Sequence, residues 1–378
     1  MMFKIRMHKA DNGDCVSIET ESEFILIDGG TAQSFDSWKT QIVGQLEKID
    51  SVIVTHIDND HVNGVIKLLM HPECPTVDSV YFNGAEQLFG QLSTGDEVDN
   101  RTDIKLQAIS KESSDIADKE PIGYSEGTSL SYVIYDKGYQ CNEVVGGKAL
   151  YREKCRAFDI GSLKFTTIGP DLNSLSELKR IWEDKLEERN IRPRIINKSY
   201  YDAFEQYASN VKEVALNNYQ ISSTKQSSIE TLANTVFEDD DSPTNRSSLS
   251  FLIEHDDKRI LYLGDCHAGI VNSWLDEQQL DKIKVDAVKI SHHGSQNNTS
   301  LELLRRIECN EYLISTNGKP HDHPDLETLA RIAIINENSD TNIHLNYNLE
   351  TIPDWFSSEL NHGYPRINLL MDSCEVKL

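Results

Sequence analysis

Short apolar runs alternate with amphipathic stretches over the first quarter of the chain. Residues 33–49 place large apolar side chains, among them Phe35, Trp38 and Leu46, on one face of a helix. The other apolar runs are short and rich in β-branched residues, which predicts strands at 3–7, 15–19, 24–27, 51–54 and 77–82. Because a helical stretch also follows the fourth run, strands and helices alternate, and the pattern predicts a layered α/β structure.

The periodicity weakens between residues 85 and 155, which we interpret as an irregular insertion, 85–155. Helical patterns occur at 86–93 and 103–110, and residues 111–128 are polar and predict a loop. Tyr and Val residues are scattered through 130–154, where we expect a hairpin. This part of the chain therefore interrupts the strand and helix order.

A clear strand pair returns at 155–160 and 163–168, joined by a Gly-Ser turn. Residues 172–243 then become more charged and predict a helical insertion, with one helix at 174–190 and further helices within 199–237. Strands and helices resume after this segment. We expect strands at 247–254, 259–263, 285–290 and 312–315, helices at 271–279, 299–307 and 325–336, and edge strands at 342–347 and 366–371.

The overall composition narrows the class of protein. The chain has 378 residues, enough for one large domain with insertions or for two domains, and a formal net charge of −25. Such an acidic balance argues against a broad grip on nucleic acid, although it leaves room for a local basic groove. The seven cysteines form no CxxC pair, and no run of about 18 apolar residues occurs, so we expect a cytoplasmic protein with no membrane contact.

Residues of the types that commonly bind metals follow several of the predicted strands. They are Asp28, then His56, Asp58, Asp60 and His61, then Asp265, then His292 and His293. Each position alone has an ordinary explanation as a turn residue or helix cap. Four such positions at strand ends are harder to explain by folding, because strand ends gather at one edge of a layered sheet. Mixed imidazole and carboxylate groups suit zinc or harder divalent ions.

Taken in order, these motifs resemble the metallo-β-lactamase fold. The nearest resemblance is to the branch typified by the soluble domain of the competence protein ComEC, without the membrane channel. The resemblance rests on HxDxDH at 56–61, Gly264-Asp265, His292-His293-Gly294-Ser295, Gly13-Asp14, Ile27-Asp28-Gly29-Gly30, Asn245-x-x-Ser248, Asn317-Gly318 and His323-Pro324. It implies one domain over 1–378, an αββα sandwich of two β-sheets flanked by helices, with a helical insertion.

The resemblance also implies two divalent metal ions, zinc or manganese. Asp265 would bridge them, His56 and Asp58 would hold the first, and Asp60 and His61 would hold the second together with His292 or His293. We favour His292 as that ligand, which leaves His293 to bind the leaving group or act as general acid. The usual second histidine is replaced by Asp58, and no histidine occurs between His71 and His255, so the first metal site is the less certain.

The implied activity is hydrolysis through a metal-bound hydroxide, with Asp60, His293 and Asp265 as catalytic residues. Asn245 and Ser248 (or Ser247) could hydrogen-bond a phosphate of the substrate, or they could cap the turn into the strand. His323 lies in a later loop and could also contact the substrate. The lead hypothesis is a phosphodiesterase or nuclease acting on DNA, which would fit a role in bacterial defence. The alternatives are a hydrolase of a small ester or phosphoester, and a non-catalytic, metal-stabilised module that binds a protein partner through 172–243.

Overall fold

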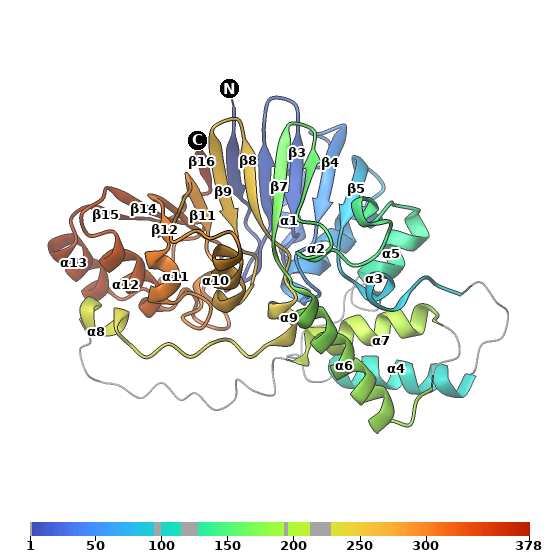
Figure 1. Cartoon of the computed structure of the whole chain (residues 1–378). Helices are drawn as coiled ribbons and strands as arrows, with labels where there is room; N and C mark the ends of the chain where they lie inside the picture. The colour runs from blue at the N-terminus through green and yellow to red at the C-terminus, as the bar shows by residue number, and fades with distance from the viewer. Residues whose placement is uncertain (1, 94–99, 115–127, 193–195, 212–227) are drawn as a thin grey trace.

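The computed structural model of the chain describes residues 2–93, 100–114, 128–192, 196–211 and 228–378. Two β-sheets lie face to face in the middle of the molecule, and helices cover the outer face of each sheet (Figure 1). This order of layers confirms the predicted αββα sandwich. None of the described helices is both long and apolar enough to span a bilayer.

The first sheet has six strands in the order β16-β1-β2-β3-β4-β5. They are β1 (Lys4–Met7), β2 (Val16–Glu19), β3 (Phe24–Ile27), β4 (Lys48–Ile53), β5 (Thr76–Tyr81) and β16 (Glu375–Lys377). Strands β1 to β3 pair antiparallel, whereas β3, β4 and β5 are parallel. The loops that follow β3 and β4 therefore open at the same edge of the sheet.

The second sheet has eight strands in the order β15-β14-β13-β11-β9-β8-β7-β6. They are β6 (Ala157–Ile160), β7 (Leu163–Gly169), β8 (Ser250–His255), β9 (Lys258–Tyr262), β11 (Ala287–Lys289), β13 (Glu311–Ile314), β14 (Thr341–Leu345) and β15 (Ile367–Leu370). Strands β9, β11, β13, β14 and β15 are parallel. Two-residue strands β10 (Ile283–Lys284) and β12 (Ile307–Glu308) pair separately.

Helices on the first sheet's side are α1 (Phe35–Trp38), α2 (Asn59–Met70), α3 (Ala85–Phe89), α4 (Asn100–Ser114), α5 (Leu130–Lys137), α6 (Leu172–Glu188) and α7 (Lys198–Ser209). Those on the second sheet's side are α8 (Ile229–Ala233), α10 (Ala268–Glu277), α11 (Leu301–Arg305), α12 (Leu326–Ile335) and α13 (Asp354–Gly363). The short helix α9 (Pro243–Arg246) precedes β8. Single-turn 3₁₀ helices are η1 (Lys39–Gln41), η2 (Glu143–Val145) and η5 (His292–Gly294).

The side chains of the central strands point alternately to two buried faces. In β3, Ile25 and Ile27 pack between the sheets, whereas Leu26 packs beneath the helices. Phe165 and Phe251 fill the opposite side of the space between the sheets. Because both faces of the central strands are covered, these strands are nearly continuous apolar runs, as expected for sheets buried on both sides.

Several predicted elements were wrong. The helix expected at 33–49 is only α1 and η1, because Gly44 adopts a positive φ of 75° and β4 begins at Lys48. The hairpin expected in 130–154 is instead helix α5 followed by η2. Strand β14, expected at an edge, lies between β13 and β15. Most of the predicted loop at 111–128 lies outside the described residues.

Two glycines bring helix α2 onto the end of strand β3. A Cβ atom on Gly64 would lie 1.8 Å from the Gly29 carbonyl oxygen, and one on Gly29 would lie 2.4 Å from the Val65 nitrogen. The Trp38 indole also donates to the Gly29 carbonyl at 3.0 Å. Close contact between the Asp28-Gly29-Gly30 turn and α2 therefore fixes the first turn of this helix, which contains Asp60 and His61.

Candidate metal centre

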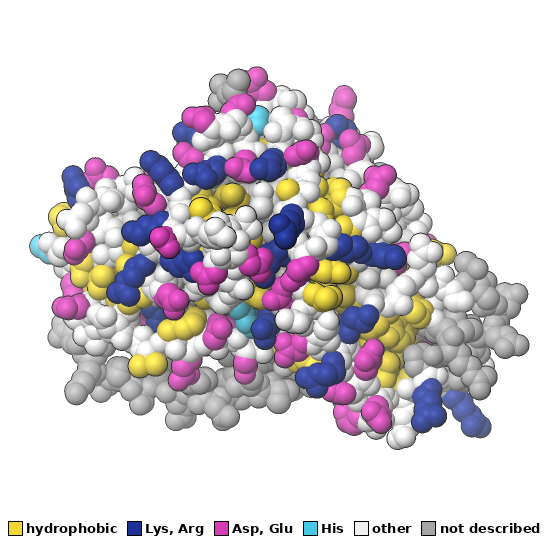
Figure 2. Space-filling model, viewed as in Figure 1, with side chains coloured by type: hydrophobic (Ala, Val, Ile, Leu, Met, Phe, Trp, Pro, Cys, Tyr) yellow, Lys and Arg dark blue, Asp and Glu magenta, His cyan; other side chains and the backbone are white. Residues whose placement is uncertain are grey.

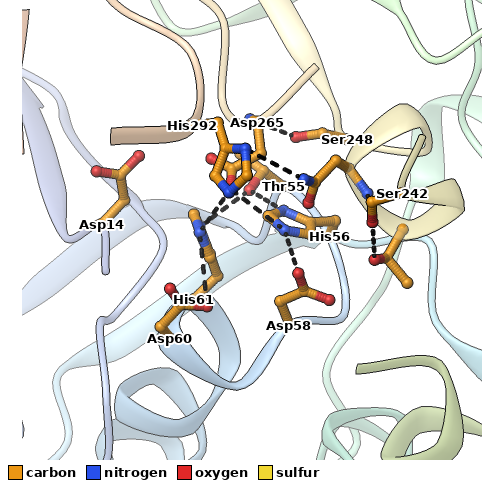
Figure 3. Close-up of polar contacts among 12 residues, drawn as sticks. Asp14, Thr55, His56, Asp58, Asp60, His61, Ser242, Ser248, Asp265 and His292 are labelled. Atoms are coloured by element: carbon orange, nitrogen blue, oxygen red, sulfur yellow. Dashed lines mark hydrogen bonds and ion pairs between the residues drawn. The ribbon is translucent and has the colours of Figure 1, made fainter. Parts of the chain in front are cut away.

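Histidine and aspartate side chains from both sheets meet at the edge where the parallel strands end (Figure 3). They are His56 and Asp58 from the β4–α2 loop, Asp60 and His61 from the first turn of α2, Asp265 after β9, and His292 and His293 from η5 after β11. The structure thus brings together every residue that the sequence suggested as a metal ligand. Figure 3 shows Asp58 next to His56 and Asp60 next to His61.

The carboxylate of Asp265 occupies the middle of this group. Its Oδ2 atom lies 3.7 Å from Nε2 of His56, 3.4 Å from that of His61, 4.0 Å from that of His292 and 3.7 Å from that of His293. These separations are longer than ordinary hydrogen bonds of about 2.7–3.2 Å. They suit ligand atoms that share an ion, since bonds of about 2.0–2.2 Å place neighbouring ligands about 3–4 Å apart.

The remaining carboxylates divide the ligands into two groups. Asp60 lies 3.6 Å from Nε2 of His293 and 3.9 Å from Nε2 of His61, and these three residues form one candidate cluster. Asp58 lies on the other side, 3.2 Å from Nε2 of His56. We refer to Asp60, His61 and His293 as the second-metal group, and to His56 and Asp58 as the first-metal group. Asp265 is shared.

Asp28 orients the histidines of the β4–α2 loop. Its side chain is fully buried, and its Oδ2 atom lies 3.0 Å from Nδ1 of His61. It also accepts hydrogen bonds from the Thr55 amide and hydroxyl, both at 2.8 Å, and the Thr55 hydroxyl lies 3.0 Å from Nδ1 of His56. With Nδ1 engaged in this way, the Nε2 atoms of both rings are directed toward Asp265, as in carboxylate–histidine–metal arrangements.

The histidines of η5 are oriented from the second sheet. Nδ1 of His293 donates to the Ser315 carbonyl at 2.9 Å, which leaves Nε2 as the ligand atom. Nδ1 of His292 lies 2.9 Å from Oδ1 of Asn298 and 3.3 Å from Nδ2 of Asn245. Both histidines adopt left-handed backbone conformations, with φ of 46° and 53°. Such conformations are uncommon outside glycine and persist where surrounding contacts hold them.

Buried ligand atoms provide the test of whether metal ions fit. Nε2 of His56, His61 and His293 and both oxygens of Asp265 are buried and form no hydrogen bond with any described residue. Burying such atoms without a partner is costly, so native proteins rarely do it. Divalent ions would satisfy all of them at once, and the mixture of imidazole and carboxylate groups suits zinc or manganese.

The electrostatics of the site also favour cations. Burial alone would lower the pKa of His293, but the carboxylates of Asp265 and Asp14 outweigh it and raise this pKa to about 9. Burial likewise opposes charge on His61, yet Asp265 and Asp28 raise its pKa well above the usual value. Conversely, His61 and His293 hold the pKa of Asp265 well below its usual range despite burial. The concentrated negative charge therefore attracts positive charge to the cluster.

A buried ion pair lies behind His293. Lys289 and Asp14 are both inaccessible to solvent, and Nζ of Lys289 lies 2.6 Å from Asp14. The other Asp14 oxygen lies 3.6 Å from Nδ1 of His293. Burial opposes ionisation of Asp14, but Lys289 and His293 lower its pKa to about 2. The Gly-Asp turn thus joins the two sheets directly beneath the site.

Residues 8–77 match the family model described as the metallo-beta-lactamase superfamily. This segment is similar in sequence to that superfamily. The matched segment contains the first-metal group and, with Asp60 and His61, most of the second-metal group. The αββα layers described above are those of the metallo-β-lactamase fold.

The solved structures that resemble this chain have low sequence identity to it. A diphosphatase of the PhnP family is 10% identical, with a TM-score of 0.42 and coverage of 100% of this chain and 98% of that chain. YhfI from Bacillus subtilis is 8% identical, with a TM-score of 0.38 and full coverage of both chains. Zinc-bound PqqB from Methylobacterium extorquens is 10% identical, with a TM-score of 0.40 and coverage of 99% and 100%. No curated protein matches the sequence.

The geometry favours His293 over His292 as the ligand beside Asp60 and His61. We expected His292 to join Asp60 and His61, because it is nearer the end of its strand. The structure instead places Nε2 of His293 beside Asp60 and holds its Nδ1 on a backbone carbonyl, so His293 has the geometry of the ligand. A histidine buried among carboxylates in this way is poorly placed to act as general acid.

Of the residues expected to contact substrate, two are buried and one lies at the rim of the site. Asn245 and Ser248 are fully buried, and the Ser248 hydroxyl accepts a hydrogen bond from the Asp265 amide at 3.1 Å. They therefore face the metal ligands from inside the protein rather than an open surface. His323 lies at the rim, with its ring centroid 5.5 Å from that of His292, and burial lowers its pKa.

Several residues that hold the site were missed in the sequence. They are Thr55, Asn298, Lys289, Asp240 and the backbone carbonyl of Ser315. Thr55 alone carried a usable signal, because it directly precedes His56. The others lie far apart along the chain, and only the assembled sheets bring them together.

Proposed function

We propose that this protein is a two-metal hydrolase that cleaves phosphodiester bonds, with DNA as the substrate. The observation that carries the proposal is the central position of Asp265 among four imidazole Nε2 atoms, with unsatisfied ligand atoms around it. When bound, two divalent ions would activate water and stabilise the oxygens of an in-line displacement at phosphorus. The motifs shared with the ComEC-like branch support DNA as the substrate.

The residues of the chain have separate roles in this proposal. Asp265 would be shared by both ions, and Asp60, His61 and His293 would hold one of them at a largely buried position. His323 lies at the rim, with its side chain 15% exposed, where it can contact a substrate that reaches His292. Because burial keeps His323 neutral, it can donate or accept a single hydrogen bond rather than act as a fixed positive charge.

A small phosphoester is the second candidate substrate, and the charge of the protein favours it. The net charge is −25, which opposes the approach of a long polyanion. Figure 2 shows Lys and Arg side chains interspersed with Asp and Glu over the described part of that face, rather than gathered in one basic area. A small substrate would need only the metal centre and the rim around His323.

The basic side chains of the insertion 172–243 are the ones that a polyanion or a protein partner could contact. Its basic residues Arg180 and Lys185 on α6 form ion pairs with acidic residues one turn away, at 3.1 and 3.3 Å. Lys198 on α7 pairs in the same way with Asp202. Such pairs are typical of a solvated helix surface. Binding of a protein partner through this segment remains a prediction. Arg194, another basic residue of the insertion, lies outside the described residues.

Nuclease activity can be tested with plasmid and single-stranded DNA in the presence of Mn²⁺ or Zn²⁺. We expect metal-dependent cleavage that falls by at least about 100-fold in Asp60→Asn and Asp265→Asn, because each variant removes a charged ligand. The matched control is Asp257→Asn, in the exposed turn between β8 and β9, which should cleave like the wild type.

Two outcomes would contradict the proposal. Turnover of bis-p-nitrophenyl phosphate without cleavage of any polynucleotide would favour the small-phosphoester alternative. Elemental analysis that finds no bound metal after incubation with Mn²⁺ or Zn²⁺ would overturn the two-metal hydrolase.

A further inference from the structure

The two groups of ligands are unequal in the structure. The second-metal group has Asp60, His61, His293 and the shared Asp265. The first-metal group has only His56 and Asp58 with the same Asp265, and the chain between β5 and β8 contains no histidine that could complete it. A four-coordinate ion held by protein side chains would need one more ligand there.

His292 is the one histidine of this cluster that belongs to neither the first-metal group nor the second-metal group. Its Nε2 atom nevertheless lies 4.0 Å from Asp265 Oδ2, at the edge of the ligand spacing shown by the other histidines. The left-handed conformation of both residues turns the neighbouring rings 69° apart, with centroids separated by 5.9 Å. Two adjacent histidines can therefore approach one bridging carboxylate from different sides.

Polar side chains hold the His292 ring from behind. Asn298 Oδ1 lies 2.9 Å and Asp240 Oδ2 lies 3.4 Å from its Nδ1 atom. The amide groups of Asn245 and Asn298 both donate to the same Asp240 oxygen, at 2.5 and 3.0 Å. The side-chain nitrogen of Asn245 also lies 3.3 Å from Nδ1 of His292. This arrangement resembles the supporting shell that metal-binding histidines usually have.

We propose that His292 binds the first metal ion and His293 the second, so that the histidine pair of η5 is divided between the two sites. The inference rests on the proposed two-metal function and extends it. Asp240 then acts as a positioning residue, because it holds His292 through the two asparagines. Since Asp240 belongs to the acidic run that ends the insertion 172–243, the insertion supplies part of the support for the first metal site.

Crystals of the zinc-loaded full chain test the assignment directly through anomalous scattering at the zinc edge. We expect two peaks, each within about 2.0–2.2 Å of its ligand atoms. One should contact Asp60, His61 and His293, and the other His56, Asp58 and His292. A second peak bonded to His56 and Asp58 but not to His292 would overturn the inference, whatever the behaviour of the variants.

Metal content measured at a fixed free zinc concentration provides the second readout. We expect His292→Gln and Asp58→Asn each to retain about one of two zinc equivalents. Asp240→Asn should weaken the first site by about 10–100-fold without changing the second. The control His362→Gln, on the exposed surface of α13, should retain both ions.

The outcomes separate this inference from the proposed function. Two zinc equivalents with unchanged affinity in His292→Gln would overturn the inference and leave the hydrolase proposal standing. A wild-type protein that binds no zinc, manganese or cobalt would overturn both. Cobalt-loaded protein adds a check on geometry, because removing a nitrogen ligand from one ion should change the visible absorption of that ion alone.

Discussion

At the scale of single residues, Asp28 organises the site as much as the metal ligands do. It is fully buried, has a positive φ of 61°, and orients His61 directly and His56 through Thr55. The sequence marked Asp28 as a strand-end residue but gave it no role. Its position shows that the loop after β3 controls the ligands after β4.

Replacing Asp28 with asparagine should weaken metal binding by about 10–100-fold. Asparagine tolerates the left-handed backbone, so the turn should be kept. In the wild type the Asp28 carboxylate accepts a hydrogen bond from Nδ1 of His61, whereas asparagine could present its amide NH₂ group, a donor, to that nitrogen. Competition with a chromophoric chelator measures the affinity. The control is Asp50→Asn, whose carboxylate also accepts a backbone N–H, that of Phe24 at 2.8 Å, away from the site. Equal affinity in Asp28→Asn and wild type would contradict this role.

The sequence could predict the ligands but not their supports. His56 to His61 lie in one run after an apolar strand, and Asp265 and His292 follow later strands, so their common edge could be inferred. Asn298 and Lys289 have no such pattern. Their roles depend on which loops meet after the two sheets pack, and buried amides and carbonyls look the same in sequence wherever they lie.

At the scale of elements, the contact between α2 and the Asp28-Gly29-Gly30 turn positions the second-metal group. Gly64→Ala should destabilise the fold by about 1–3 kcal/mol, because the added Cβ would overlap the Gly29 carbonyl. Alanine is otherwise the better helix former by about 1 kcal/mol. Gly269→Ala in α10 is the matched control, since its Cβ would meet its nearest atom at 3.7 Å, and it should be neutral or stabilising. Denaturant unfolding measures both, and equal effects would contradict the packing argument.

Glu205 ties α7 to the starts of α3 and α5. Its buried carboxylate accepts hydrogen bonds from the amides of Ala85, Leu130 and Ser131 and from the Ser131 hydroxyl. Burial outweighs these hydrogen bonds and raises its pKa from 4.5 to about 7. The folded state therefore holds this proton more tightly than the unfolded state does.

The pH dependence of unfolding follows from that shift. The contribution of Glu205 to stability is fully present below pH 4.5 and is lost as pH rises through about 7. The free energy of unfolding of the wild type should fall relative to Glu205→Gln by about 3 kcal/mol between pH 4.5 and 7.5. Urea titrations at both pH values measure the difference. A difference that does not change with pH would show that Glu205 stays ionised when buried.

The strands were easier to predict than the helical segments, for a physical reason. Short β-branched runs such as Phe24–Ile27 are buried on both faces, so their composition identifies them. Helix α5 was mistaken for a hairpin although Ser129 caps its start and Gly138 ends it with a positive φ of 72°. Its apolar side chains pack against α2 and α7, and that tertiary contact is invisible in a short stretch of sequence.

At the scale of the whole molecule, the metal centre joins the two halves of the sandwich. His56 to His61 follow a strand of the first sheet, whereas Asp265, His292 and His293 follow strands of the second. Chelation should therefore lower the melting temperature, and excess Mn²⁺ or Zn²⁺ should restore it. An ion at 100 times its dissociation constant contributes about 2.7 kcal/mol. Asp265→Asn should lose most of this metal-dependent shift in calorimetry. An unchanged shift in that variant would contradict a bridging role.

Strand β16 completes the first sheet by pairing with β1. In this pairing Lys4 lies opposite Lys377, so the two ends of the described chain lie side by side (Figure 1). During synthesis on the ribosome, the outer edge of β1 stays unpaired until Glu375–Lys377 has been made. Until then the N-terminal half exposes an open strand edge, which is where nascent chains associate wrongly. Yield of native protein in cells should therefore depend on chaperones that shield this edge.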